Sequence, residues 1–143
     1  MSFTQAITTF FQKYVDFKGR ASRSEYWWVA LAFFIITLPS TFVDIAAIVE
    51  TGEPTLSDPT NLTGYDGIAL LLALIYLLIG LATFLPSLAL TVRRLHDTGK
   101  SAWFLLMVLI PFAGPIILLV FFLLPSDKGD NVYGAPPSHL LTI

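Results

Sequence analysis

The sequence predicts an all-α membrane protein, a single membrane domain over residues 1–143. Three transmembrane helices are expected at about 26–49, 67–95 and 102–124, preceded by an amphipathic interfacial helix at about 3–16. The first observation is composition: 55% of the 143 residues are hydrophobic and 13% are charged, whereas soluble domains carry about 25% charged residues. The second is that residues 67–92 and 102–124 contain no Asp, Glu, Lys or Arg. The third is that basic residues gather in two segments, one before the first apolar run and one between the last two.

Composition also excludes several function classes. The chain has no Cys, which removes disulfides, thiolate metal sites and Cys nucleophiles. The net charge is −2 and no basic stripe is long enough to follow a phosphate backbone, so no nucleic-acid partner is expected. We find no metal-ligand spacing and no cofactor motif, and therefore expect neither a metal nor a cofactor.

The first expected element lies at the N-terminus. Apolar side chains recur at spacings of three to four residues, at Phe3, Ile7, Phe10, Phe11 and Tyr14. One face of a helix is then apolar over a stretch too short to span a bilayer, which is typical of a helix lying in the membrane interface. The alternative is a helix packed on protein.

The first span is expected from about residue 26. Ser22 and Glu25 have the spacing of a capping box, with Ser22 as N-cap. Twenty-four residues reach about 36 Å, enough for a hydrocarbon core of about 30 Å. Amphipathic rings suit the headgroup level; the expected interfacial aromatics are Tyr26, Trp27, Trp28 and Trp103. Asp44 is either an intramembrane site or a sign that the helix ends near Val43.

The remaining elements follow from turn residues. Residues 50–66 contain Pro, Gly and four acids but no Lys or Arg, and are expected to form an extracytoplasmic loop. Gly99 is expected to end the second span and Ser101 to cap the third. Pro111 and the pair Gly114 and Pro115 predict a kink or a short break in the third span. Residues 125–143 are expected to be an irregular tail.

Orientation follows from the basic residues. Seven of the eight lie in two segments: Lys13, Lys18, Arg20 and Arg23, and Arg93, Arg94 and Lys100. With three spans both segments fall on one side, and the positive-inside rule makes that side the cytoplasm. The N-terminus is then cytoplasmic and the C-terminus extracytoplasmic. Alternatively, a break at residues 111–115 makes a re-entrant segment that returns the tail to the cytoplasm.

Both basic segments thus form one predicted charge cluster of Arg20, Arg23, Glu25, Arg93, Arg94, His96, Asp97 and Lys100. One hypothesis is structural: the cluster secures the helix ends. A second is that it binds anionic phospholipid headgroups, because juxtamembrane basic residues are attracted to an anionic surface. Catalysis by His96 and Asp97 is disfavoured, because adjacent helical residues do not face each other; no enzyme is expected.

Transport is the remaining alternative. Three helices cannot enclose an aqueous path, so a transporter or channel would need an oligomer of this chain or another membrane protein as partner. Asp44 would be its functional residue, as the one charge expected at membrane depth. An accessory or interaction protein fits the sequence better.

Three motifs resemble the DUF805 family of small bacterial inner-membrane proteins. They are FKGRASRSEYWW at 17–28, RRLHDTGKSAW at 93–103 and NVYG at 131–134, accompanied by Pro86, Ala89, Pro111 and Gly114. The resemblance covers about residues 10–137. Ala102, where the family often has Gly, and the long loop at 50–66 are departures. The resemblance implies a multi-spanning membrane protein and no established activity.

Overall fold

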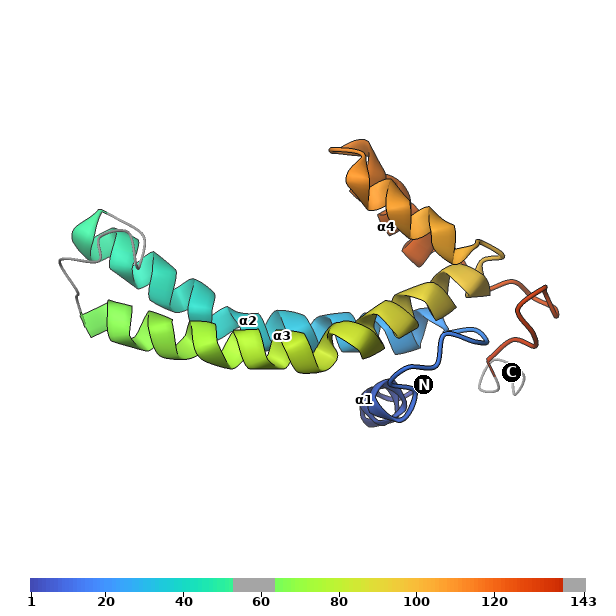
Figure 1. Cartoon of the computed structure of the whole chain (residues 1–143), viewed down its shortest axis with the longest axis horizontal. Coiled ribbons are helices and arrows are strands. Elements are labelled where there is room, and N and C mark those ends of the chain that lie inside the picture. The colour runs from blue at the N-terminus through green and yellow to red at the C-terminus, as the bar shows by residue number, and fades with distance from the viewer. Residues whose placement is uncertain (53–63, 138–143) are drawn as a thin grey trace. The chain divides into compact units, whose positions relative to one another are not determined.

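The computed structural model describes residues 1–52 and 64–137. Over these ranges every regular element is a helix, and the one β feature is an isolated bridge between Asn131 and Gly134, so the all-α prediction is confirmed. The helices are α1 (Phe3–Gln12), α2 (Arg23–Thr51), α3 (Gly64–Asp97), the 3₁₀-helix η1 (Ala102–Leu109) and α4 (Ala113–Leu123) (Figure 1). The chain divides into two compact units, one of residues 31–84 and one of residues 1–30 with the segment from residue 85 onward. Each unit is considered by itself.

The N-terminal end of helix α1 is capped by a capping box, which was not among the features predicted from the sequence. The Ser2 side chain accepts a hydrogen bond from the Gln5 N–H at 3.3 Å, and the Gln5 side chain accepts one from the Ser2 N–H at 3.0 Å. The helix ends at Gln12, four residues before the expected end. Ala6 and Phe10 are buried, whereas Phe3 and Phe11 are exposed. One side of α1 therefore packs on protein while apolar side chains remain uncovered on another.

Helices α2 and α3 are both long and apolar enough to cross a membrane. Their 29 and 34 residues correspond to about 43 and 51 Å, against a hydrocarbon core of about 30 Å. Almost none of the most apolar window of either helix is buried. A soluble protein would not leave such surface in water, so both helices fit the spans expected at 26–49 and 67–95. The expected loop at 50–66 is shorter than predicted at both ends, and its residues 53–63 lie outside the described part of the chain.

Within residues 31–84, the segments of α2 and α3 are joined by a hydrogen bond. The Tyr76 hydroxyl donates to the Ile36 carbonyl at 2.8 Å. The Thr37 and Thr83 hydroxyls donate to backbone carbonyls of their own helices. Such bonds satisfy polar side chains inside an apolar environment.

The segment 102–124 is not one continuous helix. It forms η1 and α4, separated by a tight turn at residues 110–112. In this turn the Ala113 N–H donates to the Pro111 carbonyl at 2.7 Å. Phe112 has φ 60° and ψ −54°, the strained γ-turn conformation. The residues of the expected third span thus form a helical hairpin, with the break that Pro111, Gly114 and Pro115 predicted.

The two arms of this hairpin run antiparallel and in close contact. Near its turn, a Cβ added to Gly114 would lie 1.7 Å from the Met107 carbonyl oxygen. Toward its open end, the rings of Phe104 and Phe121 meet edge to face at 5.5 Å. Eight residues of 3₁₀-helix and eleven of α-helix each extend only about 16 Å. Neither arm is long enough to cross a hydrocarbon core of about 30 Å.

The hairpin stands on the C-terminal end of α3. Leu95, Leu118 and Phe122 form its buried core, and Tyr26, Phe104, Leu105, Met107 and Phe121 pack around them. After α4 the tail runs along the same end of α3, where the Asp127 N–H donates to the Asp97 carbonyl at 3.0 Å. The three-span prediction placed the tail across the bilayer from residues 93–100. In the structure these two segments are bonded directly to each other.

Candidate functional site

Five charged side chains meet at the end of α3 and are almost completely buried. We call them the ionic latch: Arg20, Glu25, Arg93, Arg94 and Asp97, of which each is at most 5% exposed. They come from the segment before α2, the first turn of α2 and the last turns of α3. Burial of unpaired charge is very unfavourable, so each must find partners in the fold.

Asp97 is the centre of the latch. Its carboxylate accepts from Arg20 Nε at 3.0 Å, from Arg94 Nη1 and from the Ser126 hydroxyl. Both partners of each ion pair have side chains that are fully buried. Two guanidinium groups and a hydroxyl therefore surround this carboxylate.

Arg94 connects the latch to the hairpin. Its Nε and Nη2 donate to the Phe122 carbonyl at 3.3 and 3.1 Å, and Nη2 also donates to the Leu124 carbonyl. The last carbonyls of a helix lack partners within the helix and carry partial negative charge. Arg94 thus caps the C-terminal end of α4 with a cation and fixes the returning arm of the hairpin.

Arg20 makes the corresponding connection to the tail. Its Nη2 donates to the Asp127 carbonyl at 2.6 Å, and its Nη1 donates to the carbonyls of Gly129 at 2.6 Å and Gly134 at 3.3 Å. A side chain before α2 thereby fastens residues 127–134 against the end of α3. Because these contacts span more than 100 residues of sequence, they close the fold of this unit.

The second ion pair is simpler. Arg93 Nη1 donates to Glu25 Oε1 at 2.8 Å, while Arg93 Nε and Nη2 are buried without a hydrogen-bond partner. The Ser22 hydroxyl accepts from the Glu25 N–H at 3.2 Å, as an N-cap does. The Glu25 carboxylate, predicted to complete a capping box, is directed to Arg93 instead.

The end of α3 is a Schellman motif. Gly99 has φ +68°, and its N–H donates to the His96 carbonyl while the Lys100 N–H donates to the Leu95 carbonyl. Ser101 then caps η1 by accepting from the Trp103 N–H at 3.4 Å. The chain reverses over these few residues and starts the hairpin beside the latch.

His96 turns away from Asp97 toward the tail. Its ring stacks on Tyr133 at 3.8 Å between centroids and 4° between planes. Asn131 donates to the His96 carbonyl at 2.9 Å. The Asn131 and Gly134 backbones exchange two hydrogen bonds, so residues 131–134 form a tight turn docked on α3. His96 and Asp97 are therefore not an acid–base pair.

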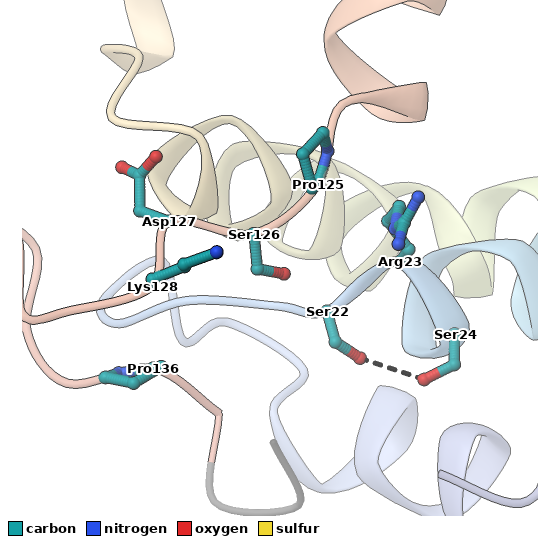
Figure 2. Close-up of a pocket in the computed structure, with 8 residues that line it drawn as sticks. All are labelled: Ser22, Arg23, Ser24, Pro125, Ser126, Asp127, Lys128 and Pro136. Carbon is teal, nitrogen blue, oxygen red and sulfur yellow. Dashed lines mark hydrogen bonds between the residues drawn. The ribbon is translucent and has the colours of Figure 1, made fainter. Parts of the chain in front are cut away.

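Five of the eight Lys and Arg residues lie outside the latch: Lys13, Lys18, Arg23, Lys100 and Lys128. Lys100 lies 5.7 Å from the centroid of the Phe121 ring, and Arg23 and Lys128 are exposed. Arg23 and Lys128 line a cleft of about 620 Å³ together with Ser22, Ser24, Pro125, Ser126, Asp127 and Pro136 (Figure 2). The structure thus divides the predicted cluster into a buried part and a solvent-accessible part.

The predicted interfacial aromatics differ in their surroundings. Tyr26 is half-buried, with its ring 4.7 Å from Phe122 of the hairpin. Trp28 Nε1 donates to the Met1 carbonyl at 3.1 Å, which ties α2 to the start of the chain. Trp27 is partly exposed and Trp103 is 77% exposed. Asp44 is half-buried in the unit of residues 31–84, whereas the latch belongs to the other unit.

The family of the chain is identified by a match over most of its length. Residues 14–135 match the family described as "Protein of unknown function (DUF805)". The chain is a member of the DUF805 family. It is 38% identical to "Inner membrane protein YhaI" and 37% identical to "Inner membrane protein YhaH", both of Escherichia coli K12, over 126 residues in each case. These alignments cover 88% of this chain and 89% and 90% of the two relatives. No solved structure matches the chain.

Membership agrees with the two apolar helices and makes this DUF805 chain one of a family of inner-membrane proteins. Its three motifs, separated by up to a hundred residues, converge on the end of α3. The predicted cluster did not include Ser126, Asp127, Lys128, Asn131 and Tyr133, which complete the site. The NVYG motif was the sequence signal for Asn131 and Tyr133.

Proposed function

We propose that this DUF805 protein is a non-catalytic accessory or interaction protein of the inner membrane that binds anionic lipid headgroups at its cytoplasmic face. The observation that carries the proposal is the division of its charges. The latch residues are buried and bonded to one another, whereas Arg23 and Lys128 are exposed beside a cleft. Buried charges hold the fold, and the accessible cations remain for a partner.

The topology that fits these contacts has two spans and one re-entrant hairpin. Helices α2 and α3 cross the membrane, and the hairpin of η1 and α4 enters from the cytoplasmic side and returns to it. The N-terminus, residues 98–101 and the tail from 125 to 137 are then all cytoplasmic. All eight Lys and Arg residues of the chain fall on that side, one more than in the three-span arrangement, in agreement with the positive-inside rule.

The hairpin turn is suited to membrane depth. Irregular backbone in lipid needs its N–H groups satisfied within the protein. Pro111 has no N–H, and the N–H groups of Ile110, Ala113 and Gly114 donate to Met107, Pro111 and Ile110 carbonyls. Phe112 is 89% exposed at the tip. These features support insertion of the tip into acyl chains.

A non-catalytic role is supported by the surroundings of Asp97. A general base must lie within hydrogen-bond reach of the substrate proton that it removes. The Asp97 carboxylate is fully buried and already bonded to two guanidinium groups and a hydroxyl, so no substrate reaches it. It acts as an anchor for Arg20 and Arg94.

Two measurements test the proposal. Because the chain has no Cys, single cysteines at Lys18, Ser57 and Val132 can be labelled in intact cells with an impermeant maleimide. We expect labelling at 57 alone, and labelling at 132 from outside would contradict the re-entrant topology. Native mass spectrometry of the protein extracted from membranes should find retained phosphatidylglycerol in preference to phosphatidylethanolamine, and equal retention of both would contradict headgroup binding.

A further inference from the structure

We infer that the cleft between the start of α2 and residues 125–128 binds the phosphate group of an anionic phospholipid, with Arg23 and Lys128 as its cationic ligands. The inference rests on the proposed function and gives it a site and a chemical group. Arg93 and Arg94 are excluded as ligands of the lipid, because both are fully buried.

The cleft has the size and lining that a phosphate ester needs. Its volume is about 620 Å³, within the range of small-molecule sites. In Figure 2 the side chain of Lys128 points into the space between the tail and Ser22, and Arg23 stands beside Pro125 at the start of α2. One cation therefore comes from α2 and the other from the tail.

The charge inside the cleft is positive. Among the described residues, no hydrogen bond or ion pair neutralises Arg23 or Lys128. Asp127 is the one acidic residue of the lining. Its carboxylate points away from the space in Figure 2 and accepts from Asn131 Nδ2 at 3.1 Å. A guanidinium presents paired donors to phosphate and an ammonium presents a point charge, so the two ligands complement each other.

A hydroxyl group adds a donor at the same place. The Ser22 and Ser24 hydroxyls lie 3.1 Å apart, and Ser22 already accepts the Glu25 N–H as N-cap. Ser24 can rotate its hydroxyl outward to a phosphate oxygen. The Ser126 hydroxyl, in contrast, donates to Asp97, so it fixes the tail wall of the cleft to the latch.

The position of the cleft favours a lipid over a soluble phosphate. Arg23 is the first residue of α2, and the partly exposed Trp27 follows one turn later. Trp side chains concentrate at the headgroup level of a bilayer, which places Arg23 among phosphates. The latch holds the tail there, since Arg20 and Asp97 bond to residues 126–129.

The test compares Arg23→Gln/Lys128→Gln with Lys13→Gln/Lys18→Gln, which makes the same change in net charge outside the cleft. Native mass spectrometry of the full-length protein in a neutral detergent measures binding of added phosphatidylglycerol, phosphatidylcholine and glycerol 3-phosphate. We expect the cleft variant to bind phosphatidylglycerol about ten- to thirty-fold more weakly and the control variant to match the wild type. Because Arg23 and Lys128 are exposed, thermal unfolding of the cleft variant should be unchanged.

Each other outcome is decisive. Equal loss in both variants would overturn the site in favour of diffuse attraction to the whole basic face. Unchanged binding in the cleft variant would overturn the site and leave the proposed function standing. A wild type without preference for phosphatidylglycerol over phosphatidylcholine would overturn both. Binding of glycerol 3-phosphate as tight as that of the lipid, lost in the cleft variant, would support the phosphate site and overturn its assignment to lipid.

Discussion

Two neighbouring arginines at the end of α3 illustrate how much depends on the direction of a side chain. Successive residues on an α-helix point about 100° apart. Arg93 therefore reaches Glu25 on α2, whereas Arg94 reaches Asp97 and the end of α4. Composition and spacing predicted that these charges gather, but not which arginine takes which partner, because that depends on the packing of distant segments.

The neighbours should respond differently to the same substitution. Arg94 uses Nε, Nη1 and Nη2 on three acceptors, and a lysine cannot replace that fork. Arg94→Lys should lower the free energy of unfolding by about 2–5 kcal/mol, since each charged hydrogen bond contributes about 1.5–3 kcal/mol. Arg93 uses Nη1 alone, so Arg93→Lys should have less than half that effect. Thermal unfolding in one detergent measures both, and equal shifts would refute the division of roles.

Asp97 should be the most sensitive acid of the latch. Asp97→Asn leaves Arg20 and Arg94 without their buried counter-charge, which costs about 3–5 kcal/mol when a buried pair is broken. Asp130 is exposed, so Asp130→Asn makes the same chemical change at a position where we expect no shift. The thermal unfolding midpoints of the two variants measure this difference in stability. A small loss in Asp97→Asn would mean that water reaches the latch.

At the scale of elements, the sequence was least informative about residues 102–124. This run of 23 apolar residues is long enough to span, and hydropathy alone does not separate a span from a folded hairpin. Pro111, Gly114 and Pro115 indicated a break but left two consequences open, a kinked span and a re-entrant segment. The consequence depends on contacts between distant residues: Arg94 caps α4, and Gly114 approaches Met107.

Gly114 is the residue that allows the hairpin arms to meet. A methyl group there would overlap the Met107 carbonyl, so the arms would have to separate and lose their packing on Leu95. Gly114→Ala should therefore destabilise the protein by at least about 1–3 kcal/mol, the usual effect of overpacking. In α3, an added Cβ at Gly80 meets nothing within 4 Å, so Gly80→Ala should be neutral or slightly stabilising. Thermal unfolding of the pair tests this, and a tolerated Gly114→Ala would disprove the close approach.

At the scale of the whole molecule, the sequence predicted the membrane class and the gathering of basic segments on one side. It left two sides open for residues 125–137, because the side depends on whether the third apolar run crosses the membrane or folds back within it. The proposed topology makes a testable statement about depth. A nitroxide on Phe112→Cys should be protected from a water-soluble relaxation agent and exposed to oxygen, as within acyl chains. The same label on Val132→Cys should be accessible to water, and equal accessibility at both positions would contradict insertion.

The transport alternative depends on Asp44 and is tested separately. For an accessory protein, wild type and Asp44→Asn reconstituted in liposomes should both leave a proton gradient intact. A leak present in the wild type and absent in the variant would instead favour an oligomeric transporter. Glu50→Gln, which removes an exposed carboxylate from the same helix, is the matched control for any change in net charge.

The contacts of Arg94 also bear on how the protein is made. Synthesis delivers Arg20, Arg94 and Asp97 well before residues 122–134, whose carbonyls complete their bonding. A nascent chain therefore holds these arginines without their carbonyl partners until residues 122–134 have been synthesised. Premature termination before residue 122 would leave them without those partners, so such truncated products should be degraded. The latch can close only after residues 122–134 have left the ribosome.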